Sequence, residues 1–277
     1  ALGFSIKAGV VPLHAWVPEV YANAPSAISG LFASVTSKAM LFILPGVSLK
    51  LNIPAEELGL FLLIFSAANM LVGVLRMLTQ QNLRRLLAFS AITHTGYLMF
   101  ILSIYFIFDL PEALAAALFS FLSIALMKAM AFLCVGVYEY RLQVKTIPML
   151  NGAFQRMPFN AVCFSIAVAG LAGIPLFAGF VGKWLIYSAA VSTRDPLVLA
   201  GFAVFLVCSI IALVSYLSAL IRQFQPAEED VQVKEEPISL WMKVPVGVLA
   251  VSVVVLGILP SAALDGIIQL VERIGFS

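Results

Sequence analysis

The stretch "GLAGIPLFAGFVGKWLIY", residues 170–187, lies inside an apolar run that extends over residues 159–191. It places a proline at 175 and a lysine at 183 among side chains that otherwise avoid charge. Proline removes a backbone donor and frees a carbonyl group, which a membrane tolerates only where protein or water satisfies the exposed groups. We therefore expect a broken transmembrane helix whose polar interior lets Lys183 gain and lose a proton. The residues expected to form the break are Gly173, Pro175 and Gly179.

Composition places the rest of the chain in a membrane as well. Of its 277 residues, 62% are hydrophobic and 11% are charged, whereas a soluble domain is about a quarter charged. Apolar runs of about 20 residues recur, which is the length that a helix needs to cross a bilayer, and they lack the alternation of membrane barrels. The sequence predicts an all-α polytopic membrane protein with about eight transmembrane helices. The expected crossings are a short one at the N-terminus, then 25–49, 58–76, 86–108, 113–138, 158–191, 196–221 and 244–271.

The sequence shows no pattern typical of a metal site or a catalytic centre. Its three cysteines, Cys134, Cys163 and Cys208, stand alone in apolar runs and are interpreted as small buried hydrophobes. There is no nucleophile–base spacing and no glycine-rich phosphate loop. We therefore predict no metal, no cofactor and no catalytic residue, and the net charge of +2 gives no indication of a nucleic-acid partner.

The loops between the crossings differ in charge. Counted on alternate sides, one set carries nine cations and the other carries Lys50, Arg194 and Arg273. Because cytoplasmic loops are enriched in Lys and Arg, we expect the first set to be cytoplasmic. The long polar linker 225–237 is mostly acidic, and we interpret it as a solvated cytoplasmic loop, with docking of a partner subunit as the alternative. The nine cations are Arg76, Arg84, Arg85, Arg141, Lys145, Arg156, Arg222, Lys234 and Lys243.

Four lysines lie inside apolar stretches: Lys7, Lys38, Lys128 and Lys183. A lysine at the bilayer centre costs about 2.5–3.5 kcal/mol even on the lenient insertion scale, so four together are hard to explain as accidents. Lysine releases its proton readily when desolvated, whereas arginine does not. The pattern predicts a proton relay in which the four ammonium groups lie at similar depth along one path, with Lys128 central.

Acidic partners for these lysines are missing from the sequence. Only Glu139 comes near a membrane segment, and it stands beside Arg141 at an expected helix end. Because a buried cation needs a partner, neutralisation or water, we expect carboxylates from another segment or from neighbouring membrane subunits.

A short frame is repeated near both expected breaks. "GFSIK" at 3–7 and "GFVGK" at 179–183 share Gly-Phe-x-x-Lys, each near a proline, Pro12 and Pro175. Transporters built from inverted repeats place broken helices at corresponding positions of their two halves. We therefore interpret Pro12 as a second helix-break residue.

Four segments, taken in order, resemble a known family. They are "KAGVVPLHAWVPEVYANAPSAISGLFASVTSKAMLF" (7–42), "QQNLRRLLAFSAITHTGYLM" (80–99), "LMKAMAFL" (126–133) and "LAGIPLFAGFVGK" (171–183). This set is similar to the antiporter-like, proton-translocating subunits of respiratory complex I, Mrp cation/proton antiporters and membrane-bound hydrogenases. The resemblance extends to about residue 222.

The resemblance implies a fold and a set of site residues. The family has fourteen helices with two inverted five-helix repeats, and this chain would supply the C-terminal portion, about the last eight helices. Residues 1–50 would end the first repeat, 51–222 would form the second, 223–243 a polar cytoplasmic loop and 244–277 the final transmembrane helix and tail. By position, the ion-translocation residues implied are Lys7, Lys38, Lys128, Lys183 and His94.

Some positions depart from the family pattern. A histidine often found four residues before the central lysine is Ile124, and the second proline of the Gly-x-Pro-Pro segment is Leu176. Ser90, Thr93 and Thr95 accompany His94 in a polar patch that could pass protons, since histidine titrates near neutrality. His14, between Pro12 and Trp16, is interpreted as structural.

The sequence thus predicts translocation of protons, with or without Na⁺, by an antiporter-like subunit of a redox-driven or Mrp-type complex in a prokaryotic cell membrane. The chain has no catalytic centre of its own, but the complex would be an ion-translocating oxidoreductase in the redox-driven case. One alternative is a structural membrane-arm subunit that no longer conducts, although replacing its lysines by leucine would then be favourable. An unrelated carrier of an organic solute is another alternative, for which mid-membrane binding groups are sparse.

Overall fold

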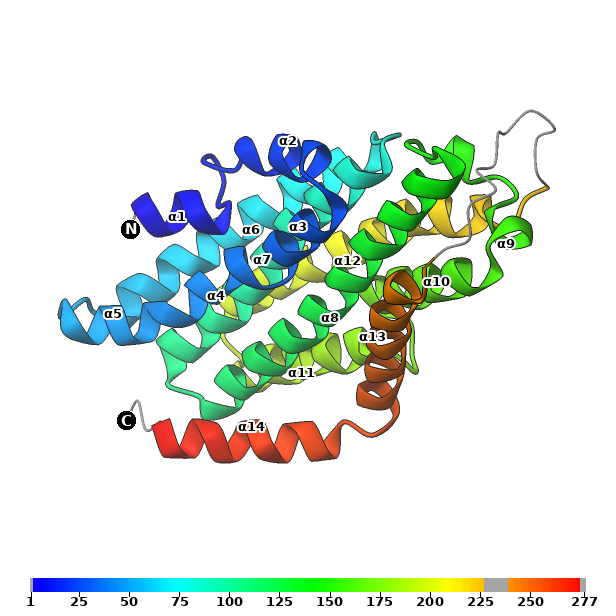
Figure 1. The fold of residues 1–277 in the computed structure, drawn as a ribbon. Helices are drawn as coiled ribbons and strands as arrows, with labels where there is room; N and C mark the ends of the chain where they lie inside the picture. Colours follow the sequence, from blue (N-terminus) through cyan, green and yellow to red (C-terminus); the bar gives the residue numbers. More distant parts are fainter. Residues whose placement is uncertain (1, 227–238, 275–277) are drawn as a thin grey trace.

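The computed structural model describes residues 2–226 and 239–274 (Figure 1). Those ranges contain no β-strand, only an isolated bridge between Asn82 and Thr146. Six helical segments are long and apolar enough to cross a membrane, which confirms the predicted all-α membrane architecture. They are Ser26–Ser48, which includes α3 (Ser26–Leu31), α4 (Ser37–Ala39) and the start of α5 (Leu44–Lys50), then α6 (Ala55–Leu78), α7 (Leu83–Phe108), α8 (Pro111–Leu142), α12 (Pro196–Arg222) and α13 (Leu240–Ile258). The shorter helices are α1 (Leu2–Ala8), α2 (Trp16–Asn23), α9 (Ala153–Arg156), α10 (Pro158–Ala172), α11 (Ala178–Thr193) and α14 (Ser261–Ile274).

Local sequence sets several helix ends. The Asn82 side chain caps α7 by accepting a hydrogen bond from the backbone N–H of Arg85 at 3.0 Å. Asp195 caps α12 in the same way, accepting from the N–H groups of Leu197 and Val198. Proline occupies the first position of α8, α10 and α12, where its missing N–H costs nothing. These caps keep the lengths of the spans close to those expected from hydropathy.

Helix α7 forms the centre of the bundle. Every residue from Ser90 to Phe106 is buried, with α6, α8, α11 and α12 packed around the helix (Figure 1). Glycines bring α6 and α7 close together: a Cβ on Gly73 would lie 2.4 Å from Thr93 Oγ1, and a Cβ on Gly96 would lie 2.9 Å from Met70 N. Small residues are the usual means of such close approach between membrane helices. Polar residues on α7 are therefore shielded from lipid.

The helices break at the two expected places. Residues 9–15 separate α1 from α2, and residues 173–177 separate α10 from α11, so the expected crossing 158–191 is two short helices joined at mid-length. At the second break Gly173 adopts a left-handed φ of +87°, which glycine tolerates best. Leu176, where the family pattern has proline, has a φ of +81°, a value that a proline ring forbids.

A third break divides the last expected crossing. The interval 244–271 was predicted as one helix, but α13 ends at Ile258 and α14 begins at Ser261, because Pro260 has no N–H to continue the helix. Helix α14 is amphipathic: Ala263, Leu264, Ile267 and Val271 share its less exposed face, which packs against α8. In Figure 1 α13 is steeply inclined to the other spans, whereas α14 lies along the edge of the bundle.

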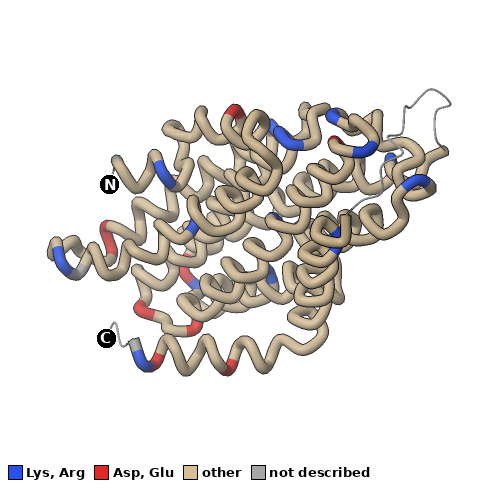
Figure 2. The backbone as a smooth tube through the Cα atoms, in the orientation of Figure 1, with Lys and Arg blue, Asp and Glu red and all other residues tan. Residues whose placement is uncertain are grey.

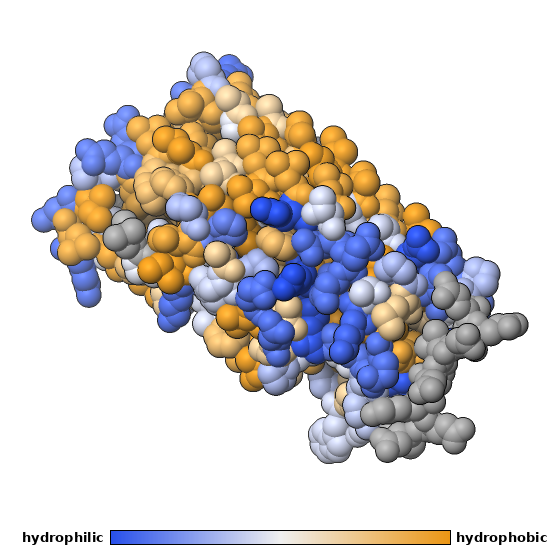
Figure 3. Space-filling view, turned by 90° about the horizontal axis from the view of Figure 1, so that it is seen from above, coloured by the Kyte–Doolittle hydropathy of each residue, from blue (hydrophilic) through white to orange (hydrophobic). Residues whose placement is uncertain are grey.

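Cations gather at one end of the bundle, where the loops are tied to one another (Figure 2). Ile147 N donates to Gln81 O and Gly152 N donates to Gln225 O, both at 2.8 Å. Seen from above, this end carries a polar patch beside an apolar surface (Figure 3). Eight of the nine predicted loop cations belong to the described residues, whereas Lys234 and most of the acidic linker 225–237 fall in 227–238, outside them.

Candidate functional site

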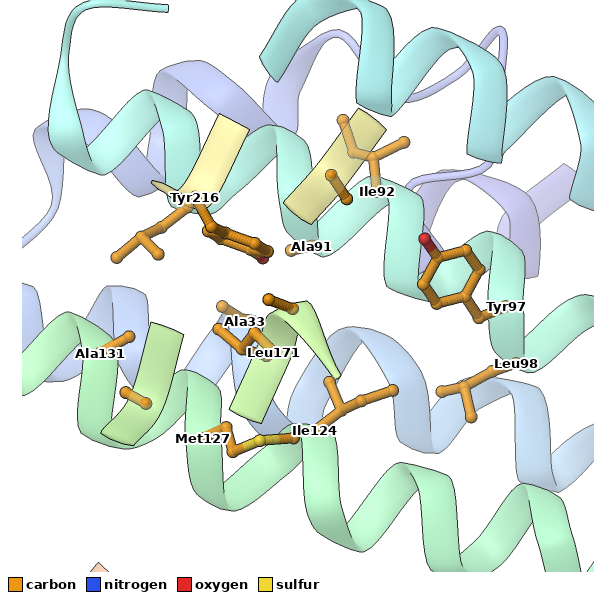
Figure 4. Packing of buried hydrophobic residues seen from close by; sticks show 14 of the residues in the cluster. Ala33, Ala91, Ile92, Tyr97, Leu98, Ile124, Met127, Ala131, Leu171 and Tyr216 are labelled. Atoms are coloured by element: carbon orange, nitrogen blue, oxygen red, sulfur yellow. The ribbon is translucent and has the colours of Figure 1, made fainter. Parts of the chain in front are cut away.

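Lys128 lies at the middle of α8 with no exposed surface. Its Nζ donates to the backbone oxygen of Leu87 at 2.9 Å and to Ser90 Oγ, both on α7. Apolar side chains of the core lie around this part of α8: Figure 4 shows Ile124 and Met127 packed near Leu171. A buried ammonium is thus held by neutral oxygens alone.

His94 lies one turn beyond Ser90 on α7 and is 3% exposed. Its Nδ1 contacts the backbone oxygen of Ser90 at 2.6 Å. Because a carbonyl oxygen only accepts, the neutral ring carries its proton on Nδ1 and leaves Nε2 as the acceptor. Lys38, Lys128 and Lys183 all lie within electrostatic range of this ring. Ser90 therefore joins Lys128 and His94, through its hydroxyl and its carbonyl respectively.

Lys183 extends from α11 back across the second break. Its Nζ donates to the backbone oxygen of Ala172 at 2.8 Å and stands 5.7 Å from the centre of the Tyr97 ring. Ala172 ends α10, so the lysine satisfies a carbonyl at the terminus of the broken helix. A Cβ on Gly173 would lie 2.7 Å from Lys183 Cδ. Glycine at 173 therefore leaves the space that the lysine side chain fills.

A small cavity of about 20 Å³ is lined by both His94 and Lys183. Its walls come from α7, α8, α10 and α11. A polar cavity of about 10–15 Å³ is enough for one water molecule. Ser123 Oγ is buried there without a hydrogen-bond partner. The polar lining residues are His94, Tyr97, Ser120, Ser123 and Lys183.

Lys38 lies in an irregular part of the span Ser26–Ser48. A π-helical turn, Phe32–Thr36, precedes it and a 3₁₀ turn, Met40–Ile43, follows it. Its side chain is fully buried, and Nζ donates to the backbone oxygen of Ala33. Turns of the π type are frequent at functional sites. Here the irregular backbone turns a carbonyl toward a buried ammonium.

Lys7, in contrast, is exposed at the end of α1. The first break is held by Asn69 of α6, whose Oδ1 accepts from Val11 N at 2.8 Å and whose Nδ2 donates to Gly9 O at 3.3 Å. Pro12 is exposed in the turn that follows. His14 also lies there, and burial lowers its pKa below the ordinary value.

Carboxylates stand apart from the buried lysines. Lys38, Lys128 and Lys183 form no ion pair with the residues that the structure describes. Glu139, which stands next to Arg141 in the sequence, pairs with Arg84 of α7 instead. Glu19 pairs with Arg85 at 2.8 Å, and both side chains are largely exposed. Glu19 and Glu139 therefore link helices at the cation-rich end and do not form ion pairs with the buried lysines.

Sequence reasoning did not identify Asn69, Tyr97, Ser120 or Ser123. An asparagine and several serines inside apolar spans were a usable signal for some of them, since buried polar groups need hydrogen-bond partners. The sequence did not predict that Ser120 and Ser123 of α8 lie near His94, because their proximity depends on how α7 and α8 pack against each other. Among residues 2–226 and 239–274, no group of three or more His, Cys, Asp or Glu could hold a metal ion.

Comparison with known proteins gives a consistent result. Residues 1–210 match the family described as NADH:quinone oxidoreductase/Mrp antiporter, transmembrane part. NADH-quinone oxidoreductase subunit N of Deinococcus radiodurans is 33% identical over 263 residues, covering 94% of this chain and 51% of that protein. The chain spans about half the length of the curated relatives it matches.

Solved structures share the fold. A chain of the Mrp complex from Dietzia sp. DQ12-45-1b superposes with a TM-score of 0.88 at 23% identity, covering 98% of this chain and 57% of the other. A chain of respiratory complex I from Thermus thermophilus superposes with a TM-score of 0.75 at 28% identity, covering 95% and 56% respectively.

Proposed function

The chain belongs to the family of NADH:quinone oxidoreductase/Mrp antiporter membrane subunits, and on that premise we propose that it translocates protons through its buried lysines. The observation that carries the proposal is the arrangement of Lys38, Lys128 and Lys183. All three are buried, and each donates to a backbone carbonyl. In the proposal the host is a redox-driven or Mrp-type complex.

The chemistry of the lysines supports a relay. An ammonium group bound only by neutral oxygens in a low dielectric is poorly stabilised, whereas a neutral amine at the same place is not penalised. Each lysine can thus hold or release a proton when a charge nearby changes. Arginine could not, because its guanidinium stays protonated.

The proposed path connects neighbouring groups step by step. Lys128 exchanges a proton with Ser90 Oγ, which it contacts directly. The ring of His94 is next, with Nδ1 held by the Ser90 carbonyl and Nε2 free to accept. A water in the cavity beside Ser120 and Ser123 bridges from His94 toward Lys183. Lys38 supplies the path from the other side of Lys128, since its span, Ser26–Ser48, packs against α8.

Lys7 completes the row through a partner that is not found among the described residues. Its exposed ammonium is proposed to meet a carboxylate from another segment or from a neighbouring membrane subunit. In the same scheme residues 1–50 end one inverted repeat and residues 51–222 form the other, with the cation-rich loops cytoplasmic. A prokaryotic cell membrane is the proposed location.

The second candidate function is a non-conducting membrane-arm subunit. It is favoured by one observation, the apolar Ile124 in the wall of the cavity, since a polar side chain there would shorten the gap between His94 and Lys183. Against it stands the cost of three buried lysines, which a scaffold would lower by substitution with leucine.

The test uses the assembled complex in membrane vesicles, with driven proton uptake followed by a pH-sensitive dye. Lys128→Met should abolish the proton uptake due to this subunit, while Lys50→Met, which removes an exposed lysine, should leave it unchanged. Repeating the assay with and without Na⁺ distinguishes the two ions. Uptake by Lys128→Met at the wild-type stoichiometry would rule out conduction through Lys128 and favour the scaffold.

A further inference from the structure

A second cavity, of about 200 Å³, lies at the cation-rich end of the bundle and is not lined by Lys38, Lys128 or Lys183. It is formed by the last turns of α8, the start of α10 and the first turns of α13. Among the residues that the structure describes, none of those lining it is acidic and three are cationic: Arg141, Arg156 and Lys243. The proton path does not use this cavity, so its charge requires another explanation.

Arg141 is the unusual member of the three. Its Nε is buried but has no hydrogen-bond partner in the described ranges 2–226 and 239–274. Glu139, only two residues away, is engaged by Arg84 and does not neutralise it. A guanidinium nitrogen that is shielded from water and unbonded is costly. An anion in the cavity would supply the missing acceptor.

The start of α10 adds to the positive electrostatic potential in the cavity. Pro158 opens the helix after Met157, so the N–H groups of Phe159 and Asn160 belong to the first turn, where no intrahelical acceptor exists. The positive end of the helix dipole therefore points toward the cavity. Asn160 donates its own side-chain amide to Cys134 O at 3.1 Å, which fixes it in the wall.

The remaining walls are apolar. They consist of Val137, Met157, Phe159, Met242 and Val246, and Phe159 is 47% exposed toward the outer surface of the bundle. Trp241, next to Met242, is 87% exposed, and tryptophan is typical of the level where a membrane helix meets the headgroups. The cavity thus joins a cationic pocket to an apolar outer wall at the level of the membrane interface.

We infer that this cavity binds the phosphate headgroup of an anionic phospholipid, with the phosphate at Arg141 and Lys243 and the chains against Phe159 and Val246. Arginine suits the role because its planar fork can bind two phosphate oxygens. Basic pockets between membrane helices are known to hold such headgroups. Free inorganic phosphate carries the same charge but has no acyl chains. The apolar wall therefore distinguishes a phospholipid from inorganic phosphate as the ligand.

The test uses the whole complex in mild detergent and titrates it with short-chain phosphatidylglycerol, short-chain phosphatidylcholine or inorganic phosphate, following thermal stabilisation. Phosphatidylglycerol should bind most tightly. Arg141→Gln should weaken it about tenfold, and Lys243→Gln, at an exposed position that leaves folding intact, about fivefold. Arg222→Gln, at the same end but outside the cavity, is the matched control and should have no effect.

One more variant separates the two sources of phosphate. Phe159→Ser should weaken phosphatidylglycerol but leave inorganic phosphate unchanged, because only the lipid touches the apolar wall. The assignment is overturned if Arg141→Gln and Lys243→Gln both bind phosphatidylglycerol like the wild type. Equal binding of phosphatidylcholine, or of inorganic phosphate, would equally overturn it.

Discussion

The two helix breaks carry the same frame, Gly-Phe-x-x-Lys, but their lysines lie in opposite surroundings. Lys183 is 8% exposed and donates to the backbone oxygen of Ala172, so it satisfies a carbonyl group at the edge of its own break. Lys7 is exposed, and the first break is held instead by Asn69 of a neighbouring helix. A proline lies in each break, Pro12 in the first and Pro175 in the second, whereas the helices packed around each break determine the surroundings of the nearby lysine.

Lys183 is expected to give the largest effect. In the assembled complex, Lys183→Met should reduce proton uptake by this subunit to background, because no titratable group would replace it beside the cavity. Lys183→Arg should fail as well, since arginine does not release its proton. Uptake is measured in vesicles, with assembly checked by the yield of purified complex. Uptake at the wild-type rate in either variant would remove Lys183 from the path.

Gly173→Ala tests the geometry of the same break by crowding the Lys183 side chain rather than replacing it. The new Cβ would lie 2.7 Å from Lys183 Cδ, at a φ of +87°. We expect a loss of about 2 kcal/mol in the free energy of unfolding, from the left-handed backbone and the crowding together. Gly46→Ala, with nothing near its added Cβ, is the matched control. Thermal unfolding of the two variants compares them, and equal midpoints would contradict the close fit at 173.

Asn69→Ala tests the first break. It removes both hydrogen bonds to the segment 9–11 and leaves Val11 N without its acceptor, so we expect a loss of about 1–3 kcal/mol. Amide hydrogen exchange should rise at Gly9 and Val11 and stay unchanged at 173–177. A rise at both breaks would show that Asn69 supports the whole bundle rather than the first break.

Lys7→Met should have the smallest effect on stability, within about 0.5 kcal/mol, because its side chain is exposed. Proton uptake by the complex should nevertheless fall, if Lys7 meets a carboxylate there. A structure of the assembly gives the direct measurement, and Lys7 Nζ should lie within about 4 Å of a carboxylate oxygen. Finding only lipid or apolar side chains around Lys7 would remove it from the row.

Hydropathy was enough to locate most spans. The expected intervals 58–76 and 196–221 correspond to α6 and α12 within a few residues, because each needs a long apolar run and ends at a cap or a charged loop. The interval 244–271 was the exception. Pro260 and the polar residues Asp265 and Gln269 after it indicated the break, but a proline inside a helix can also be tolerated, as Pro245 is in α13.

The candidate site was predictable by residue type but not by neighbourhood. Lys128 and His94 stood out because charge and imidazole are rare in apolar runs, yet their common contact with Ser90 depends on how α7 and α8 are rotated against each other. Glu139 shows the same limit: its neighbour in sequence is Arg141, but its partner is Arg84 on another helix.

The sequence by itself determined that the chain is a bundle of membrane helices and where the second helix breaks, because a bilayer requires long apolar runs and proline cannot continue a hydrogen-bonded helix. It also singled out the lysines, since charge in such runs is costly. Only the tertiary structure decided that Lys183 and Lys128 are enclosed while Lys7 is exposed. It also decided that Asn69 bonds to the first break and that Ser120 and Ser123 of α8 line the cavity beside His94. Burial and hydrogen bonding between helices depend on which faces meet, and that is set by the packing of distant segments rather than by local sequence.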